Sequence, residues 1–314
     1  MKAWQFTGVN KPLALNEVPE PTPSRGDVLI KTMAAGMCHS DIGVLEIEGF
    51  VPFPMPSPIT LGHEVAGVVE AVGDGVTQWK KGDRVAIALG AGPVGFARDG
   101  GYAPKITAPA DTLIALPDSV SFALGAIATD AGATAYHGVV SAGEVKKDDR
   151  VGIIGYGGLG QIGAQVATLL GAHVFVAEPK ENLWPSITAA GAERVVADVS
   201  DLAAEKLDVI IDFAGFGTTT AAAIRTVREG GRVVQIGLGK TEATISTADL
   251  VSNRITLIGS LSGTQDDVAG VISLFATGKI DMTTTEVGFD DIPGALERLA
   301  QGKAHGRLVA LYNQ

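Results

Sequence analysis

The chain has 314 residues, which exceeds the usual size of one hydrophobic core, so two domains are expected. Hydrophobic residues make up 46% of the chain and charged residues 19%, a balance that supplies folded cores and excludes an intrinsically disordered protein. The formal net charge of -11 disfavours general binding to nucleic acid or to anionic membranes, and no basic run in the sequence offsets it.

Short strands separated by turns are predicted for the first third of the chain. Segments rich in β-branched residues mark these strands at Val28 to Thr32, Val65 to Val72 and Arg84 to Ala88. Clusters of glycine and aspartate between the segments are typical of turns. The pattern predicts a β-rich first domain.

Near Asp130 the pattern changes to apolar strands that alternate with alanine-rich helical stretches, which favours βαβ units and a doubly wound parallel sheet. The predicted strands are Arg150 to Ile154, Ala172 to Ala177, Arg194 to Val196, Val209 to Phe213, Arg232 to Ile236 and Ile255 to Gly259. A helix over Ile292 to Ala300 and a strand over Arg307 to Leu311 follow, and both could rejoin the first domain. The predicted fold class is therefore α/β.

Cys38 is the only cysteine of the chain, so no disulfide can form within it. The first residues, Met1 to Phe6, lack the apolar centre of a signal peptide, and no apolar segment is long enough to span a bilayer. We therefore expect a cytoplasmic protein without a membrane partner. In that setting the Cys38 thiol is a packing group, a redox-sensitive group or a metal ligand.

The clearest nucleotide signal is the sequence Gly155-Tyr156-Gly157-Gly158-Leu159-Gly160, which lies between a predicted strand and a predicted helix. Gly155 permits a tight turn, Gly157 lets the backbone approach a pyrophosphate, and Gly160 lets the helix pack closely on the strand. The amides at the start of the helix would face the phosphates. Because Gly occurs 41 times in the chain, the strand and helix around the motif give it most of its weight.

Glu178 follows the second predicted strand of this region, where a carboxylate accepts hydrogen bonds from the adenosine ribose. A 2'-phosphate would meet a like charge there, so the sequence favours NAD over NADP, although Lys180 opposes this preference. The alternative interpretation is a buried glycine turn with a solvated glutamate, as in folds that bind no nucleotide.

A zinc site is the second chemical hypothesis. Cys38, His63 and a carboxylate from Glu64 or Asp130 would supply ligands that zinc accepts and would leave one coordination position for substrate. Each residue also has an ordinary interpretation: a packed cysteine, a core histidine, a surface glutamate and a helix N-cap. On the residues alone the N-cap is the favoured role of Asp130, and the spacing does not prove that the groups converge.

Several sequence elements occur in an order that resembles the zinc-dependent medium-chain alcohol dehydrogenases. They are Cys38-His39-Ser40-Asp41, Thr60-Leu61-Gly62-His63-Glu64, Gly82-Asp83-Arg84-Val85, Gly100-Gly101-Tyr102-Ala103, the glycine turn and Gly230-Gly231-Arg232-Val233-Val234. The resemblance covers nearly the whole chain. It implies a GroES-like catalytic domain over residues 1–131 and 263–314, a Rossmann domain over residues 132–262, an active cleft between them, and a homo-oligomer.

The resemblance also implies roles for individual residues. Cys38 and His63 would bind one catalytic zinc ion, with Asp130 at the position of a third ligand and Glu64 as a close or exchanging carboxylate. The other implied roles are a proton relay at Ser40, a group beside the ligands at Asp41, pyrophosphate contacts at His39 and Arg307, and a nicotinamide contact at Thr134. The ordinary alternatives to these roles are a helix cap, a solvated acid, surface charges and a core position.

Two departures from the family pattern are visible. The stretch between Arg84 and Tyr102 contains no cysteine, so the structural zinc of many relatives is not expected. Gly43 stands where many relatives have a histidine that ends the proton relay, so water or a ribose hydroxyl would pass the proton to solvent.

The leading functional hypothesis is an NAD-dependent alcohol dehydrogenase that interconverts a small alcohol and an aldehyde or ketone. One alternative is a zinc-free NAD(P)H-dependent reductase of activated double bonds, which has no need of the ligand set. Another is a non-catalytic nucleotide-binding protein. Leu45, Phe50, Phe53 and Met55 fit the wall of a substrate pocket and a loop packed on the core equally well.

Overall fold

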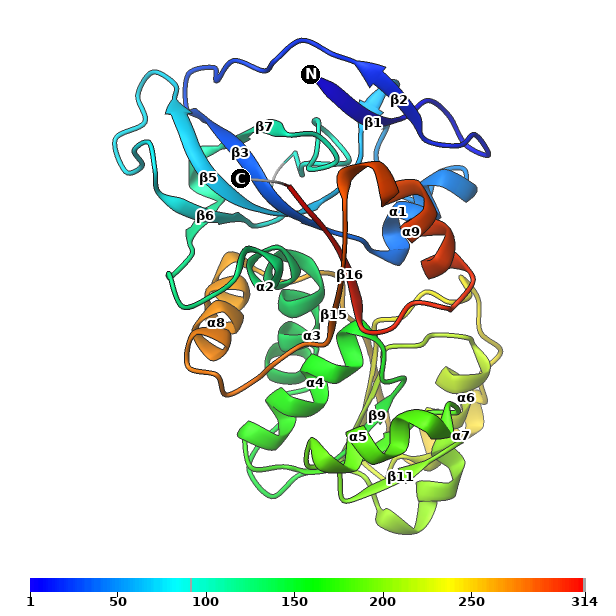
Figure 1. The fold of residues 1–314 in the computed structure, drawn as a ribbon. Coiled ribbons are helices and arrows are strands. Elements are labelled where there is room, and N and C mark those ends of the chain that lie inside the picture. The colour runs from blue at the N-terminus through cyan, green and yellow to red at the C-terminus, as the bar shows by residue number, and fades with distance from the viewer. Residues whose placement is uncertain (91, 313–314) are drawn as a thin grey trace. The chain divides into compact units, whose positions relative to one another are not determined.

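The computed structural model describes residues 1–90 and 92–312 and divides the chain into two compact units (Figure 1). The first unit consists of Met1–Ala133, Thr264–Gly278 and Met282–Gln314, and the second of Thr134–Gly263 and Lys279–Asp281. Among the described residues, none of the helices combines the length and the apolar character that crossing a membrane requires.

β3 (Asp27–Gly36) is the central strand of the first unit. It belongs to a seven-stranded sheet in the order β15-β16-β3-β5-β6-β8, and β7 pairs with it outside that path. The other strands of this sheet are β5 (Glu64–Val72), β6 (Arg84–Ile87), β7 (Lys105–Pro109), β8 (Leu113–Ala115), β15 (Thr284–Val287) and β16 (Arg307–Leu311). β3 extends beyond its predicted end at Thr32 because its last residues pair with β5 on one side and with β16 on the other.

A smaller sheet in the same unit leads the chain toward His63. It consists of β1 (Lys2–Phe6) between β2 (Ala14–Glu17) and β4 (Ile59–Thr60). The amide of Leu61, just after β4, donates to the carbonyl of Trp4 over 3.3 Å. This pairing holds the backbone that precedes His63 against the N-terminal strand.

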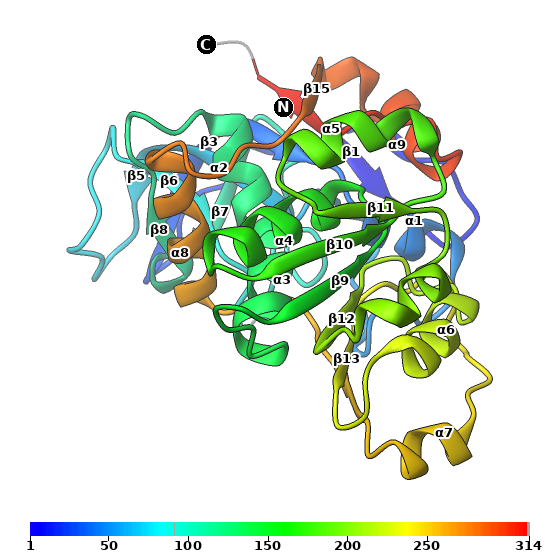
Figure 2. The same cartoon turned by 90° about the horizontal axis from the view of Figure 1, so that it is seen from below.

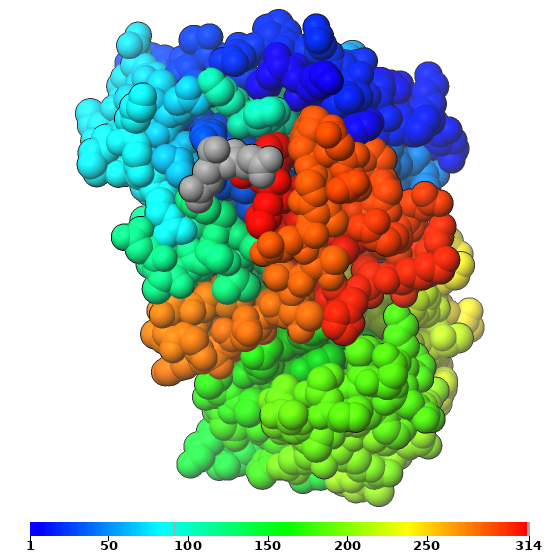
Figure 3. All heavy atoms as spheres, in the orientation of Figure 1, coloured from blue at the N-terminus to red at the C-terminus, as the bar shows by residue number. Residues whose placement is uncertain are grey.

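β16 returns the end of the chain to the first unit, where it runs antiparallel to β3 with Val309 opposite Gly36. Helix α9 (Ile292–Ala300), which begins and ends as predicted, contacts α1 (His39–Glu46). Figure 3 shows this orange-to-red tail side by side with the blue N-terminal segment. The two segments share one apolar core, which includes Phe6, Met37, Val44, Leu61, Ile292, Leu296 and Leu308.

A nearly continuous helical stretch runs from residue 122 to residue 142. It consists of α2 (Phe122–Ile127), η2 (Ala128–Gly132), α3 (Ala133–His137) and η3 (Gly138–Ala142). η2 is a π-helical turn, in which the amide of Ala133 reaches back to the carbonyl of Ala128. The extra residue in such a turn re-aims the side chains around it, and η2 carries Asp130. Helix α8 (Gln265–Ala276) contacts both α2 and η2.

The second unit contains a six-stranded parallel sheet in the order β11-β10-β9-β12-β13-β14 (Figure 2). Its strands are β9 (Arg150–Ile154), β10 (His173–Ala177), β11 (Arg194–Val196), β12 (Val209–Asp212), β13 (Arg232–Gln235) and β14 (Thr256–Gly259). Helix α4 (Gly158–Leu169) contacts β9 and β10, and α6 (Thr218–Thr226) contacts β12 and β13. The remaining helices in the described part of the chain are η1 (Ala110–Thr112), η4 (Glu181–Leu183), α5 (Trp184–Ala189), η5 (Val199–Glu205), α7 (Thr247–Ser252) and η6 (Phe289–Asp291).

The strand order reverses between β9 and β12, which is the topological switch point at which doubly wound sheets bind nucleotides. All the strands predicted for this region are present, so the doubly wound α/β prediction is confirmed. The predicted ends differ by one residue at several strands. β12 ends at Asp212 because the Oδ1 atom of that residue accepts hydrogen bonds from the amides of Ala214 and Gly215 and turns the chain.

Candidate metal centre and nucleotide-binding turn

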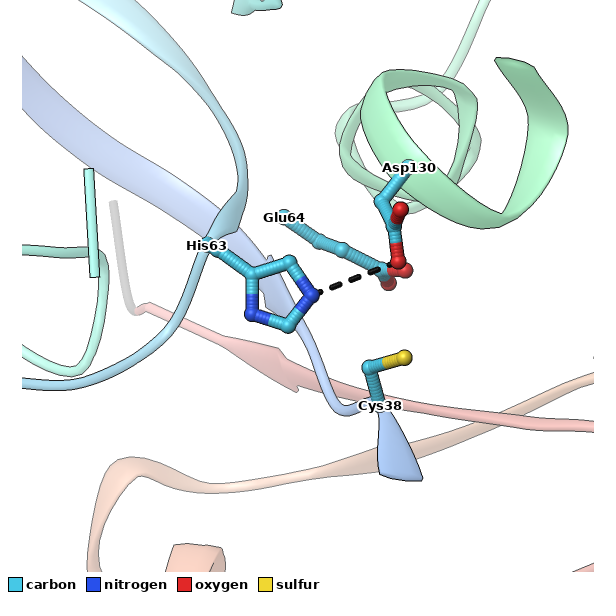
Figure 4. A group of neighbouring side chains, drawn as sticks. All are labelled: Cys38, His63, Glu64 and Asp130. Carbon is cyan, nitrogen blue, oxygen red and sulfur yellow. Dashed lines mark hydrogen bonds and ion pairs between the residues drawn. The ribbon is translucent and has the colours of Figure 1, made fainter. Parts of the chain in front are cut away.

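Four side chains that lie far apart in the sequence converge in the first unit. Cys38, His63, Glu64 and Asp130 each present one ligand-type atom, and these atoms all lie within 4.8 Å of one another (Figure 4). Ligand atoms around a tetrahedral zinc ion are about 3.4–3.8 Å apart, so small side-chain adjustments would close this group around the ion. One thiol, one imidazole and two carboxylates therefore form a donor set that fits zinc.

Cys38 is placed by the junction of β3 and α1. It is the N-cap residue of α1, and its amide donates to the Oδ2 atom of Asp41 over 2.9 Å. Only 7% of Cys38 is exposed, and the hydroxyl of Ser40 lies 3.6 Å from its sulfur. Asp41 is fully buried, so the alternative of a solvated acid is wrong for this residue.

His63 is held from three directions. Its Nδ1 atom lies 3.2 Å from Oδ1 of Asp41, and its Nε2 atom lies 3.3 Å from Oδ2 of Asp130. The ring of Phe96 stacks on the imidazole with centroids 4.5 Å apart. A buried carboxylate beside Nδ1 favours a proton on that nitrogen, which directs Nε2 toward the other ligand atoms.

The charges around His63 dominate its titration. Burial alone would lower the pKa of His63, but the carboxylates of Asp41 and Asp130 together raise that pKa well above its ordinary value. Burial raises the pKa of Asp130, yet its hydrogen bond to His63 and the charges of His63 and Arg307 hold that pKa well below the usual range. In the metal-free protein a proton on His63 therefore neutralises part of the negative charge at the centre.

Asp130 is not a helix N-cap, contrary to the role favoured by the sequence alone. It lies inside the π-helical turn η2, in the middle of a continuous helical stretch, where no helix begins. Its carboxylate faces the imidazole of His63 (Figure 4). The same turn directs the amide of Ala131 to Oε1 of Glu64 over 3.2 Å, so η2 contacts both residues of the His63-Glu64 pair.

Glu64 and Arg307 form a buried ion pair. Glu64 is fully buried and Arg307 is 4% exposed, so neither the surface glutamate nor the surface arginine considered from the sequence is correct. The Nε and Nη2 atoms of Arg307 donate to the two oxygens of Glu64. Gly36 makes room for this carboxylate, because a Cβ atom there would lie 1.9 Å from Oε2 of Glu64.

The ion pair decides the charge state of its members. Burial raises the pKa of Glu64, the charge of Arg307 opposes that rise, and the outcome is a pKa of about 7. Burial would lower the pKa of Arg307, but the charge of Glu64 raises it above its ordinary value. Arg307 therefore remains a cation beside the candidate metal ligands at every physiological pH.

The glycine turn of the second unit follows β9 as predicted. Gly155 has a φ of +84°, which only glycine adopts readily, and a Cβ atom on Gly160 would lie 1.9 Å from the carbonyl oxygen of Gly155. By contrast, a Cβ atom on Gly157 would meet no protein atom within 4 Å. The backbone of Gly157 is therefore not covered by other protein atoms on this side. It lies beside the N-terminus of α4, whose first turn contains Gly158, Leu159 and Gly160.

Glu178 lies beside this turn. Its Oε2 atom accepts a hydrogen bond from the amide of Tyr156 over 2.9 Å, and its Oε1 atom accepts one from the amide of Lys180 over 2.9 Å. The residue is only 6% exposed, so a fully solvated glutamate is not what the structure shows. The carboxylate joins the glycine turn to the end of β10, the position expected of a ribose-binding acid.

The other predicted site residues lie in ordinary secondary structure. His39 and Ser40 form the first turn of α1, in the first unit. Local desolvation and the positive charge of Arg307 both lower the pKa of His39. Thr134 lies in α3 in the second unit and is 7% exposed.

Two residues near the candidate metal centre, Phe96 and Tyr102, were given no role in the sequence analysis. Phe96 stacks on His63, and Tyr102 donates to Asp41. Only Tyr102 had a signal, because it belongs to a motif that supports the family resemblance.

Gly43 contacts the ring of Phe50 so closely that a Cβ atom on Gly43 would lie 2.4 Å from that ring. Phe50 also packs on the core of the first unit, which favours the packed-loop interpretation of its segment.

Comparisons with known proteins agree with this geometry. Residues 24–118 match the family model for the alcohol dehydrogenase GroES-like domain, and residues 158–277 match the model for zinc-binding dehydrogenases. An alcohol dehydrogenase of Geobacillus stearothermophilus is 32% identical over 98% of this chain and 99% of its own length. An NAD-dependent alcohol dehydrogenase of Sulfurisphaera tokodaii is 29% identical, with 98% of this chain and 99% of its own length covered.

A solved structure extends the comparison to three dimensions. The cobalt- and zinc-bound thermostable alcohol dehydrogenase of Pyrobaculum aerophilum matches with a TM-score of 0.88 and 26% identity, covering 99% of both chains. The α/β architecture, with a β-rich GroES-like part and a Rossmann sheet, is therefore confirmed. With a group of four side chains that fits zinc and a glycine turn of the dinucleotide-binding pattern, the chain belongs to the zinc-dependent alcohol dehydrogenases of the medium-chain dehydrogenase family.

Proposed function

We propose that this enzyme uses NAD to interconvert an alcohol and the corresponding aldehyde or ketone at a zinc ion bound by Cys38, His63 and Asp130. The convergence of the four ligand-type atoms within 4.8 Å carries this proposal. A thiolate, an imidazole and one carboxylate leave a fourth position open, as catalytic rather than structural zinc sites do. Neither a zinc-free reductase nor a non-catalytic nucleotide-binding protein has a use for such a set.

Asp130 rather than Glu64 is the resting carboxylate ligand in this proposal. The carboxylate of Asp130 faces Nε2 of His63, while both oxygens of Glu64 accept hydrogen bonds from Arg307. Moving Glu64 onto a metal ion would break the buried ion pair and both hydrogen bonds from the guanidinium of Arg307, which is costly. Arg307 therefore restrains Glu64 and adds a positive charge near the thiolate.

The chain's own groups would handle the proton of the alcohol. When bound, zinc supplies a Lewis acid that lowers the pKa of a hydroxyl, and NAD accepts the hydride. The Ser40 hydroxyl lies 3.6 Å from the Cys38 sulfur, and it would take up the proton of an alcohol bound at the metal. Gly43, one turn further along α1, has no side chain to receive it, so water or a ribose hydroxyl would complete the transfer.

The cofactor is assigned to the glycine turn. Gly155, Gly157, Gly158, Leu159 and Gly160 would hold the pyrophosphate at the start of α4, and Glu178 would hold the ribose and favour NAD over NADP. His39, Thr134 and Arg307 are assigned to the cofactor only by resemblance. Since Nε and Nη2 of Arg307 already bind Glu64, a phosphate contact would come from its other terminal nitrogen.

The metal content of four proteins tests the zinc proposal. The wild-type protein should contain about one zinc ion per chain and reduce NAD with a panel of small alcohols. Asp130→Cys should retain zinc, because a thiolate is also a zinc ligand, whereas Asp130→Ala should lose most of it. Glu64→Gln should retain it.

Two results would contradict this assignment. Loss of zinc from Glu64→Gln together with its retention in Asp130→Ala would make Glu64 the ligand. A zinc-free wild-type protein that reduces activated double bonds with NADPH would support the zinc-free alternative instead.

We also propose that the protein is a homo-oligomer that pairs through β14. This strand is the last in its sheet, and Val251, Leu257 and Leu261 near it are 74%, 37% and 85% exposed. No charged residue occurs from Ile255 to Gly263, so the strand lacks the charges that usually protect a sheet edge. Antiparallel pairing of two copies about a two-fold axis would cover it.

The molar mass in solution tests this pairing. The wild-type protein should have the mass of at least two chains by light scattering, and Leu257→Lys should reduce it toward that of one chain. Val72→Lys is the matched control, since Val72 is a comparably exposed residue, at 38%, on a strand of the other unit. A monomeric wild-type protein would refute the proposal. The cytoplasmic location stays a prediction from the sequence.

A further inference from the structure

The phenol of Tyr102 is connected to His63 through Asp41. Tyr102 is fully buried, and its hydroxyl donates a hydrogen bond to Oδ2 of Asp41 over 2.9 Å. The other carboxylate oxygen of Asp41 lies 3.2 Å from Nδ1 of His63. One buried carboxylate thus joins a phenol on one side to the imidazole of a proposed zinc ligand on the other.

The backbone fixes the position of Tyr102. Its amide donates to the carbonyl of Leu61 over 2.9 Å, and its own carbonyl accepts from the amide of Trp4 over 2.9 Å. Gly62, immediately before His63, has a φ of +91°, and a Cβ atom there would lie 2.5 Å from the Tyr102 ring. The ring therefore packs directly on the segment that presents His63.

Asp41 depends on this hydroxyl because it is a fully buried carboxylate. Its Oδ2 atom accepts hydrogen bonds from the Cys38 amide and from the Tyr102 hydroxyl, and its Oδ1 atom faces His63. A buried charge is stable only when hydrogen-bond donors surround it, and charge-assisted bonds of this kind are directional. Loss of the phenol hydroxyl would remove one of the donors that hold the Asp41 carboxylate, and the carboxylate would then rotate toward its remaining donors.

We propose that Tyr102 is a positioning residue for the metal centre. By holding Asp41 in place, it fixes the orientation of the His63 ring and keeps the proton on Nδ1, so that Nε2 is presented to the metal. This inference rests on the proposed role of His63 as a zinc ligand. It adds Tyr102 as the hydrogen-bond donor to Asp41, the carboxylate that contacts the imidazole. Hydrogen bonds at this remove from a metal ion still affect metal affinity.

Metal affinity in the variant Tyr102→Phe tests the inference directly. The substitution keeps the ring and removes only the hydroxyl. Competition with a chromogenic chelator should show zinc bound about 10-fold more weakly than in the wild-type protein. The absorption spectrum of the cobalt-substituted variant should also differ from that of the wild type, because the ligand geometry changes.

Tyr312→Phe is the matched control. The Tyr312 hydroxyl donates to the carbonyl of Gly101, the residue next to Tyr102, so this variant loses a phenol hydroxyl from the same region without affecting Asp41. Its zinc affinity and cobalt spectrum should equal those of the wild type. Equal losses in both tyrosine variants, or none in Tyr102→Phe, would overturn the inference.

Two further variants keep the outcome interpretable. His63→Ala should lose zinc; if it retained zinc at wild-type affinity, the proposed ligand set itself would be wrong, which differs from a failure of Tyr102 alone. Asp41→Asn breaks the same connection from its centre. If Tyr102→Phe does not fold, a weakened zinc affinity in Asp41→Asn supports the inference, and an unchanged affinity refutes it.

Discussion

The nucleotide-binding turn and the metal centre are built from the sequence in opposite ways. The turn is local: the hydrogen bond between Tyr156 and Glu178 joins residues only 22 positions apart. The metal centre is assembled from distant segments, with 67 positions between His63 and Asp130 and 243 between Glu64 and Arg307. A local motif can be recognised in the sequence from its order of strand, glycines and helix. A dispersed site forms only when the whole unit has folded, so its residues are harder to recognise in the sequence.

This difference predicts that the two sites fail independently, and the largest effect should come from the metal centre. Cys38→Ala removes the thiolate, so the protein should lose zinc and its kcat/KM with an alcohol should fall by about 1000-fold or more. NAD affinity, measured by fluorescence titration, should be unchanged because the turn lies in the other unit. A parallel loss of NAD binding would contradict the independence of the two sites.

The reverse experiment acts on the turn. Gly160→Val would place side-chain atoms against the Gly155 carbonyl, so NAD should bind about 100-fold more weakly and the unfolding temperature should fall. Gly157→Ala should weaken NAD about 10-fold without a change in stability, because its Cβ atom meets no protein atom. Zinc content should stay at the wild-type level in both. If Gly157→Ala bound NAD normally, the pyrophosphate would not approach this glycine.

The pH dependence of zinc binding sharpens the description of the metal centre. Folding raises the pKa of His63, so this residue stabilises the metal-free protein below its unfolded-state value, and that contribution is lost as pH rises through the folded value. Zinc must displace the same proton, so its affinity should increase with pH by up to about 10-fold per unit. Chelator competition between pH 6 and pH 9 measures this slope. A flat profile would argue against His63 as a ligand.

A smaller change should separate the two cofactors at the turn. Glu178→Gln removes the negative charge that opposes a 2'-phosphate but keeps a hydrogen-bonding side chain. The ratio of kcat/KM for NAD to that for NADP should fall about 10-fold, with zinc content unchanged. If the ratio stays the same, another residue selects the cofactor.

The smallest expected effect concerns packing beside α1. Gly43→Ala would bring a Cβ atom to 2.4 Å from the Phe50 ring, which should destabilise the protein by about 1–3 kcal/mol in denaturant unfolding. In a Phe50→Ala protein, which lacks the ring, adding Gly43→Ala should lower the free energy of unfolding by less than it does in the wild-type protein. If Gly43→Ala were as stable as the wild type, the ring of Phe50 would have room to move, and position 43 would accept a side chain.

The sequence predicts local elements, such as the strands and the glycine turn, more accurately than it predicts the dispersed metal centre. The strands of the parallel sheet were predicted within about a residue at each end, because apolar runs and glycine turns report local structure. The sequence names the four residues that converge in the structure, but on the residues alone it favours a helix cap for Asp130. A π-helical turn inside a long helix has no local sequence signature, and it is this turn that directs the carboxylate to His63.

The amino-acid sequence by itself determined the chemistry available to this protein: one thiol, a Gly-His-Glu triplet, and a glycine turn followed by an acid. Only the tertiary structure decided how those groups are used. It pairs Glu64 with Arg307, turns Asp130 toward His63, and links Tyr102 to the same histidine through Asp41. The physical reason is that burial makes each of these charges depend on a specific partner, and the partner comes from a strand or turn that only folding brings near.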